Sequence, residues 1–386
     1  MKTNYQSFPV KELTPDCKSN SNSKLTNSKL KKLRKAGLNP NYWYAFEYER
    51  AVKKGDVLEV KFWNTSIALF RDHNGQIKAI ENRCAHRQLK LSVGEVKDCK
   101  LVCPYHGWSY NGDGKLVEVE HELFGKTLPS IQLKTYPVRV KYALIWIFPG
   151  DINLANQVEI PHLPELEGKT SWPCVPFEFT WQSHHSMIID NVNDFAHAHL
   201  HRKYQPFSNA KLTKCEEEGD RINISYDTFM GGDGLSKLVI DRDRVETNSI
   251  ELCFDYPYQW SNIGGKIKHW CFILPVDERT TKVFFLVFYS DALKIPFTSI
   301  PMPKWLTVLA LKFAKQVLIK PLFNQDGVIV KKEQEGFEAH PDLVNIELNP
   351  VVHMCQNLTP HSALTACSTE RYMNYHYYFE STNSTN

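Results

Sequence analysis

Residues 84–108 read CAHRQLKLSVGEVKDCKLVCPYHGW, and this stretch decides the fold of the first part of the chain. It opens with Cys84-x-His86 and, sixteen residues later, continues with Cys103-x-x-His106. Each pair supplies one thiol and one imidazole, a donor set for zinc or for an iron–sulfur cluster. Zinc ribbons usually use Cys-x-x-Cys pairs, so a Cys2His2 zinc site is the minor alternative. The order fits a two-iron cluster in which one iron takes both thiolates and the other takes both imidazoles.

The surroundings of these two loops agree with a cluster site. Each loop is expected at a turn after a strand, with Pro104 and Gly107 shaping the second loop and Trp108 shielding the metal. Cys99 lies between the loops and is expected to take no part. The spacing resembles that of the Rieske [2Fe–2S] domain, in which neutral imidazoles raise the reduction potential above that of an all-cysteine cluster.

A second group of possible metal-binding residues lies in MIIDNVNDFAHAHLHRKYQPF, residues 187–207. Most of this stretch is expected to form a helix at about 186–203. Asp190, Asp194, His197 and His201 recur at i, i+4, i+7 and i+11, which places them on one face of a helix. Histidines four residues apart can bind one metal ion. Two histidines with one remote carboxylate form the facial triad of non-haem Fe(II) oxygenases. The alternative is a core helix whose histidines are satisfied by ordinary hydrogen bonds.

The remote carboxylate is expected in LFNQDGVIVKKEQEGFE, residues 322–338. The four acidic residues of this stretch are Asp326, Glu333, Glu335 and Glu338. We favour Asp326 because it opens an amphipathic helical run, whereas Glu333 and Glu335 lie two turns further on and face other ways.

With both groups in view, residues 41–340 resemble the α subunit of Rieske non-haem iron ring-hydroxylating oxygenases. The similarity is closest to the group that holds chlorophyll-catabolic oxygenases, O-demethylases and steroid hydroxylases. The resemblance implies a [2Fe–2S] cluster on the first four ligands and a mononuclear Fe(II) on His197, His201 and Asp326. This chain has three residues between the two histidines where the family usually has four.

The resemblance also implies how such a protein works. O₂ is the co-substrate, and a separate ferredoxin or flavin reductase delivers electrons, so NAD(P)H acts only indirectly. The expected assembly is a homotrimer in which electrons cross between neighbouring subunits. Asp194 would then link a cluster histidine of one subunit to His197 of the next. Asp190 is expected either to hydrogen-bond near the iron or to be an ordinary surface acid.

The predicted fold class is α+β. An all-β Rieske domain at 40–150 precedes a helix-grip-like catalytic domain at 151–345, built from an antiparallel sheet with helices. Residues 1–39 are Asn-, Ser- and Lys-rich, which predicts a mostly disordered leader with a short basic helix near its end. Residues 346–386 are expected to form a C-terminal tail.

Composition narrows the location and partners of the protein. A net charge of +3 and 23% charged residues give no support for nucleic-acid binding. The ten cysteines are mostly scattered and no signal peptide is recognisable, which favours the reducing cytoplasm, or an organelle interior if the leader is a transit peptide. Residues 305–323 are apolar but interrupted by lysines, so a half-buried helix is favoured over membrane contact.

The reaction expected from these features is hydroxylation or oxidative demethylation of an organic substrate, apolar or cyclic by family resemblance. The aromatic-rich residues 253–262 and 268–277 are expected to line or back the substrate pocket. Two other functions stay open at this point. One is a desaturase on the same scaffold, acting on a sterol-like substrate, and the other is an electron-transfer protein without oxygenase activity.

Overall fold

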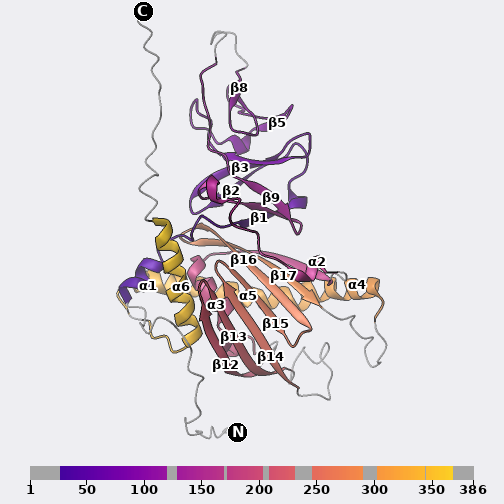
Figure 1. Cartoon of the computed structure of the whole chain (residues 1–386), viewed down its shortest axis with the longest axis vertical. Coiled ribbons are helices and arrows are strands. Elements are labelled where there is room, and N and C mark those ends of the chain that lie inside the picture. The colour runs from indigo at the N-terminus through magenta and orange to yellow at the C-terminus, as the bar shows by residue number, and fades with distance from the viewer. Residues whose placement is uncertain are drawn as a thin grey trace, which may run out of the picture.

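The computed structural model describes residues 27–119, 128–168, 172–202, 208–230, 246–289, 302–343 and 345–367. An all-β domain forms one end of an elongated molecule, and a domain of one large sheet with helices forms the other (Figure 1). This arrangement confirms the predicted α+β fold class and the order of its two parts.

The N-terminal domain consists of small antiparallel sheets, as the alternating sequence predicts. Its strands are β1 (Tyr44–Tyr48), β2 (Val57–Phe62), β3 (Thr65–Arg71), β4 (Ile77–Glu81), β5 (Glu95–Lys97), β6 (Lys100–Val102), β7 (Ser109–Tyr110), β8 (Leu116–Glu118), β9 (Val138–Lys141) and β10 (Leu144–Ile147). Three sheets result, with strand orders β1-β10-β9, β2-β3-β4 and β5-β6-β7-β8. The last of these carries one of the two Cys/His loops.

The second domain is built on one antiparallel sheet of seven strands in the order β11-β17-β16-β15-β14-β13-β12. The strands are β11 (Cys174–Trp181), β12 (Ser208–Glu218), β13 (Arg221–Met230), β14 (Glu246–Asp255), β15 (Tyr258–Ile263), β16 (Ile267–Asp277) and β17 (Thr280–Tyr289). Apart from the β11–β17 pair, strands that neighbour each other in the sheet are also consecutive in sequence.

Strand β17 shows how this sheet is covered on both faces. Val283 and Val287 belong to the main core cluster, which also contains residues of the helices. Phe284 and Phe288 point to the other face and pack in a second cluster with Trp43 of the N-terminal domain. Successive side chains of a strand alternate between its two faces. One face of β17 therefore packs against the core that contains the helices, and the other face packs against the all-β domain.

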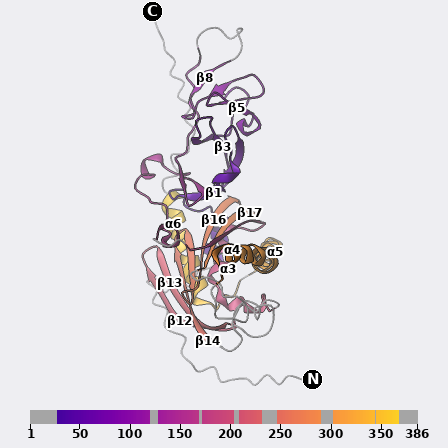
Figure 2. The same ribbon diagram turned by 90° about the vertical axis from the view of Figure 1, so that its right-hand side faces the viewer.

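The helices are α1 (Asn27–Leu33), α2 (Pro164–Glu167), α3 (His185–Asn193), a short 3₁₀ segment η5 (Phe195–His199), α4 (Lys304–Ala314), a π-helical turn η7 (Lys315–Ile319), α5 (Lys320–Ala339) and α6 (Pro350–Cys367). In the turned view of Figure 2, α4 and α5 are seen nearly end-on beside β16 and β17. Helix α3 packs against both α5 and α6. The three helices therefore form one layer that can present side chains from distant parts of the sequence to one place.

The short basic helix expected near the end of the leader is confirmed as α1, and the expectation about the C-terminal end needs correction. Leu33 and Arg34 are buried, and Arg34 contacts Ser186 and Asp190, so this helix belongs to the folded part of the chain. Residues 1–26 lie outside the described residues. The expected tail from 346 onward contains α6, whose Val351 and Cys355 are fully buried. Burial of these apolar side chains makes α6 part of the catalytic domain.

The segment 305–323 forms α4, η7 and the start of α5, and α4 is buried on one side only. Thr307 and Leu311 are buried, whereas Trp305 and Phe313 are exposed. This confirms the prediction of a half-buried helix. Among the described residues, none of the helices has the length and apolar character needed to cross a bilayer.

Candidate metal centres

The first Cys/His loop follows β4, and the second joins β6 to β7. In the first loop the N–H of Gln88 donates to the carbonyl of Cys84 at 2.8 Å. In the second loop the N–H of Gly107 donates to the carbonyl of Cys103 at 3.1 Å. Gly107 has φ +69°, a left-handed conformation that favours glycine. Each loop therefore turns tightly just after its cysteine, so that cysteine and histidine face the same side.

The four side chains of these loops converge. Cys84 and Cys103 are buried free thiols, and a hydrogen bond joins them. The ring centroids of His86 and His106 lie 4.5 Å apart. Burial raises the pKa of the Cys103 thiol, and the neighbouring Cys84 raises it further. A bound cation would reverse this preference and stabilise the thiolate.

Aromatic side chains enclose the same site. The indole of Trp108 stacks on the His86 ring at 4.8 Å with an interplanar angle of 7°, as expected of a shielding residue. The hydroxyl of Tyr110 lies 3.4 Å from the Cys84 sulfur and accepts a hydrogen bond from the N–H of Ala85 at 3.0 Å. The sequence reasoning did not single out Tyr110. The sequence offered one indication of its role, because Tyr110 lies on β7 two residues after Trp108 and so points to the same side of the strand as Trp108.

Cys99 lies away from this cluster. It occupies the two-residue turn between β5 and β6 with φ +62°, next to Asp98 at φ +44°. A positive φ at both central residues is the mark of the tight turns that join antiparallel strands.

The second group of residues does not form the continuous helix that the periodicity predicts over 186–203. Helix α3 ends at Asn193, Asp194 is extended with φ −96° and ψ 108°, and a 3₁₀ segment follows. The Asp194 carboxylate accepts the N–H of Ala196 at 2.7 Å and so caps the new segment. The expectation failed because periodicity does not reveal a capping residue inside an apolar-periodic stretch.

Despite this break, His197, His201 and Asp326 come together. One candidate ligand atom from each residue lies within 4.8 Å of the other two. The Nε2 atoms of His197 and His201 are 3.7 Å and 3.2 Å from Oδ1 of Asp326. The His201 side chain is almost fully enclosed, while that of His197 is 25% exposed. The three candidate ligands are therefore enclosed except on the side of His197, which solvent can reach.

The two histidines differ in their electrostatics. Burial lowers the pKa of His197, and the nearby Asp326 carboxylate only partly opposes this effect. Burial also lowers the pKa of His201. The hydrogen bond to Asp326 and the charge of its carboxylate outweigh this effect, so the pKa of His201 is raised overall. A neutral imidazole is the form that binds a metal, and an ion at this site would compete with the proton for both rings.

Polar neighbours fix the orientation of these three side chains. The Nδ1 atom of His201 lies 3.0 Å from Oε1 of Gln325, so an N–H there donates to the amide and leaves Nε2 toward Asp326. Asn191 donates to Oδ1 of Asp326 at 3.4 Å. The backbone carbonyl of Asp194 accepts a hydrogen bond from His197. Sequence reasoning missed these neighbours because they contact the three residues only after folding.

Asp326 lies inside α5 rather than at its start, because the helix already begins at Lys320. The other three acids considered for its role lie apart from the histidines. Glu335 pairs with Lys332, Glu338 pairs with Arg279, and Glu333 pairs with Arg34. Of the four carboxylates, the structure places Asp326 beside both histidines.

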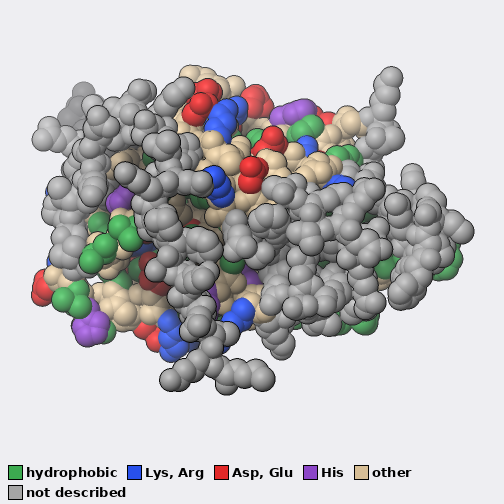
Figure 3. All heavy atoms as spheres, turned by 90° about the horizontal axis from the view of Figure 1, so that it is seen from below, with side chains coloured by type: hydrophobic (Ala, Val, Ile, Leu, Met, Phe, Trp, Pro, Cys, Tyr) green, Lys and Arg blue, Asp and Glu red, His purple; other side chains and the backbone are tan. Residues whose placement is uncertain are grey.

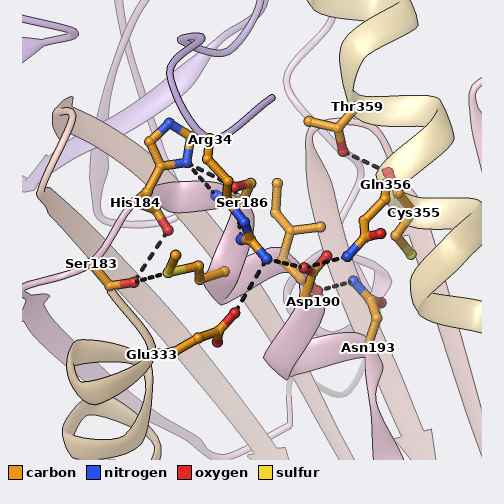
Figure 4. Close-up of polar contacts among 12 residues, drawn as sticks. Arg34, Ser183, His184, Ser186, Asp190, Asn193, Glu333, Cys355, Gln356 and Thr359 are labelled. Atoms are coloured by element: carbon orange, nitrogen blue, oxygen red, sulfur yellow. Dashed lines mark hydrogen bonds and ion pairs between the residues drawn. The ribbon is translucent and has the colours of Figure 1, made fainter. Parts of the chain in front are cut away.

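Asp190 belongs to a different arrangement, shown in Figure 4. Its Oδ2 accepts hydrogen bonds from Arg34 at 2.8 Å and from Gln356 at 2.8 Å. Arg34 also donates to Ser186 at 2.9 Å and to Glu333 at 3.2 Å. We call these five residues the Arg34 network. It joins the segment after α1 to α3, α5 and α6.

Burial is the main reason that two acids of the Arg34 network have raised pKa values. It raises the pKa of Asp190, with Arg34 opposing. Partial burial also raises the pKa of Glu333 to about 7, again against the opposing charge of Arg34, although 42% of this side chain stays exposed. A cavity of about 270 Å³ next to this network is lined by Arg34, Asp190, Glu333, Asp194 and His197, among others. The accessible side of His197 therefore opens toward polar and charged groups.

Aromatic side chains gather on the sheet side of Asp326. Phe323 lies one turn before it on α5 and stacks on Phe285 of β17 at 4.5 Å. Phe177, Phe179 and Trp181 of β11 complete this group. A methyl group at Gly327 would lie 2.4 Å from the Trp181 indole, so glycine permits the close approach of α5 to β11.

The aromatic-rich stretches 253–262 and 268–277 lie on strands β14 to β16. Tyr258, Trp270 and Phe272 belong to the cluster that packs on the N-terminal domain. Phe254 and Cys271 face the main core. Most of these aromatic rings therefore back the sheet rather than line the space beside Asp326.

Comparisons with known proteins follow the same division of the chain. The model of the Rieske [2Fe–2S] domain matches residues 42–137. The model of the vanillate O-demethylase oxygenase C-terminal domain matches residues 181–356. A 4β-methylsterol monooxygenase of Methylococcus capsulatus is 44% identical over 331 residues, which are 85% of this chain and 89% of that protein. This chain is a Rieske non-haem iron oxygenase.

Other relatives are more distant. The chloroplastic chlorophyllide a oxygenase of Chlamydomonas reinhardtii is 32% identical over 41% of this chain and 24% of its own length. Among solved structures, dicamba monooxygenase bound to 3,6-dichlorosalicylic acid superposes with a TM-score of 0.70. The match covers 87% of this chain and all of that one at 19% identity, and it shows a shared fold.

Membership of the family confirms the predicted oxidoreductase class and its cofactors, a [2Fe–2S] cluster and a mononuclear iron. The family assignment favours an iron–sulfur cluster over zinc in the first two loops, and an oxygenase over a simple electron carrier. The donor sets fit both groups: two thiols with two imidazoles, and two imidazoles with one carboxylate. Members of the family act on organic substrates and receive electrons from separate proteins.

Proposed function

We propose that this protein is a sterol monooxygenase that hydroxylates the methyl group at the 4β position of a sterol. The observation that carries this proposal is the 44% identity to a 4β-methylsterol monooxygenase across 85% of the chain. Aromatic side chains of the core, Phe285 and Phe323 among them, pack on the sheet side of Asp326 and make that side apolar, which suits an apolar substrate such as a sterol.

In this proposal Cys84, His86, Cys103 and His106 hold the [2Fe–2S] cluster, and His197, His201 and Asp326 hold the mononuclear iron. The bound iron supplies the chemistry that activates O₂. One oxygen atom is inserted into a C–H bond of the methyl group, and the other is reduced to water, which consumes two electrons from the reductase and two protons. Gln325 and Asn191 orient the ligands through the contacts described above.

The proposal includes the partners inferred from the family. A ferredoxin or flavin reductase supplies the electrons, and the chain works as a homotrimer in which they pass between subunits. Asp194 is the residue proposed at that crossing. Its carboxylate is held by Asn349 at 2.8 Å and by the N–H of Ala196, and its carbonyl contacts His197, so its position is linked to that of the imidazole.

The test uses the full chain purified with its iron and supplied with a reductase, O₂ and a 4β-methylsterol. A product heavier by one oxygen atom is expected, while desaturation would give a product lighter by two hydrogens. A sterol without methyl groups at that carbon should not be oxidised. Absence of product from the 4β-methylsterol, with oxidation of other substrates, would contradict the sterol assignment.

The site assignment is tested separately with His197→Ala. Product should be lost while the visible spectrum of the [2Fe–2S] cluster stays unchanged, because the two metal groups are held by different domains. Metal analysis should give about three irons and two acid-labile sulfides per wild-type chain, and about one iron fewer in the variant. His199→Ala, two positions away in the same segment, is the matched control and should keep its iron.

A further inference from the structure

The outer side of α4 and η7 presents a row of apolar side chains. The five exposed apolar residues are Trp305, Val308, Leu309, Phe313 and Val317. They recur at i, i+3, i+4, i+8 and i+12, which is one face of a helix. Trp305 and Phe313 are each 70% exposed. Aromatic side chains each offer about 150–250 Å² of contact area, so this row is a substantial exposed patch.

The inner side of α4 holds the helix in a fixed orientation. Leu311 packs in the main core, and Thr307 donates to the carbonyls of Met302 and Pro303 at 3.3 Å. The Lys315 amine contacts the carbonyl of Pro176 and lies 4.9 Å from the Phe177 ring centroid. The helix therefore cannot turn to bury its outer side without losing these contacts.

Positive charge accompanies the exposed row. Residues 292–325 contain five lysines and no aspartate or glutamate. Lys312, seven residues after Trp305, is exposed on the same side as the row, and Lys320 is exposed just beyond η7. Residues 304–325, which form α4, η7 and the first turn of α5, include these two exposed lysines and no carboxylate, so the charge beside the row is positive.

Figures 1 and 3 show where this element lies. Helix α4 projects at the edge of the catalytic domain in Figure 1, beyond the sheet. In Figure 3 a few hydrophobic side chains show at the same edge, between residues drawn in grey. An element at the edge of the molecule is well placed to approach a flat surface.

We propose that the outer side of α4 and η7 docks this protein on the surface of an anionic lipid bilayer. Trp305, Leu309 and Phe313 would enter the boundary between headgroups and acyl chains. The lysines would contact anionic headgroups, each contributing to attraction near the surface. None of the described helices can span a bilayer, so the binding is peripheral.

A two-fold pair of this chain fits the same face less well than a bilayer, because the patch would meet itself and bring Lys312 into an apolar contact with its own copy. An anionic bilayer neutralises this charge. In the proposed homotrimer the patch would instead meet a different surface of the neighbour, an arrangement that the gel-filtration result below distinguishes from docking on lipid. The docking does not depend on the sterol proposal, although a bilayer is also where a sterol resides.

The experiment is flotation of the full chain with vesicles of phosphatidylcholine alone or with added phosphatidylserine. Flotation is expected with the anionic vesicles and should weaken as salt increases. Trp305→Asp and Phe313→Asp should each weaken binding at least about tenfold, because each removes one inserted aromatic side chain. Lys312→Glu should reduce binding to anionic vesicles. Ile152→Asp, an exposed apolar residue elsewhere, is the matched control and should float like the wild type.

Each variant must retain the visible spectrum of the cluster and the circular dichroism of the wild type, which separates lost docking from lost folding. If the wild-type chain does not float with anionic vesicles, the proposal is wrong. It is also wrong if Trp305→Asp floats normally, or if the variant only converts an oligomer into a monomer in gel filtration. Failure of the sterol assay alone would leave the flotation result unaffected.

Discussion

The Arg34 network gives the sharpest prediction about stability. Replacing Arg34 by methionine keeps most of the side-chain volume and removes the charge together with hydrogen bonds to Ser186, Asp190 and Glu333. The Arg34 side chain is 2% exposed and that of Asp190 is 13% exposed, so the variant leaves a buried carboxylate held by Gln356 alone.

The magnitude follows from the two ion pairs that Arg34 makes. Removing one partner of a buried pair costs about 3–5 kcal/mol, and this applies to Asp190. The Glu333 side chain is 42% exposed, so that pair adds only about 0–1 kcal/mol. We therefore expect Arg34→Met to lower the free energy of unfolding by about 3–5 kcal/mol, a large part of the stability of a typical domain.

The assay is urea unfolding of the purified chain followed by circular dichroism. Arg221→Met is the matched control, because Arg221 pairs with Asp255 at 2.6 Å but both side chains are at least 40% exposed. Its loss should cost no more than about 1 kcal/mol. The double variant Arg34→Met with Asp190→Asn should recover much of the lost stability, since no charge is then left buried. Equal effects of the Arg34 and Arg221 substitutions would refute the reasoning.

Three further predictions concern α5 and the cluster. Gly327→Ala should lower stability and iron content because its methyl group meets the facing indole, whereas Gly336→Ala on the same helix meets nothing and should be neutral or stabilising by up to about 1 kcal/mol. The raised pKa of Glu333 means that the folded state holds a proton that the unfolded state releases. The free energy of unfolding should therefore fall as the pH rises from about 4.5 to about 7, and Glu333→Gln should flatten that dependence in urea titrations. Tyr110→Phe removes the hydroxyl beside the Cys84 sulfur and should lower the reduction potential measured by spectroscopic titration, with iron content unchanged.

The sequence predicts those parts of the fold whose secondary structure depends on a local pattern of apolar, polar and turn-forming residues. Strands β2, β3 and β4 follow alternating residues separated by turn signals, and the two Cys/His pairs are adjacent in sequence within each loop. Helix α6 was missed because its apolar residues do not form a clear stripe, and its burial depends on the face of β13 and α3 that it covers. Tertiary packing, rather than local propensity, makes it helical.

The candidate iron site also depends on contacts between residues that are distant in sequence, which local patterns do not predict. His197 and His201 could be paired from their spacing, but the reason given was a regular helix, and the chain is instead broken at Asp194. Asp326 was selected among four acids by its position in a helical run, and its contact with both histidines could only be seen in the structure. Arg34 lies 156 residues before Asp190, and no local pattern in the sequence indicates that the two residues pair.

Helix α5 contributes side chains both to the aromatic group and to the Arg34 network, which lie on opposite sides of Asp326. Phe323, Asp326, Val330 and Glu333 recur at i, i+3, i+7 and i+10 and so lie along one face. Phe323 belongs to the aromatic group on the sheet side, while Glu333 belongs to the Arg34 network. Asp326 lies between the two, with closely packed aromatic rings on one side and the polar cavity that reaches His197 on the other. Hydroxylation of a C–H bond requires protons for the oxygen that becomes water, and the charged groups of that cavity are the ones placed to supply them, while the packed rings keep water away from the other side of Asp326.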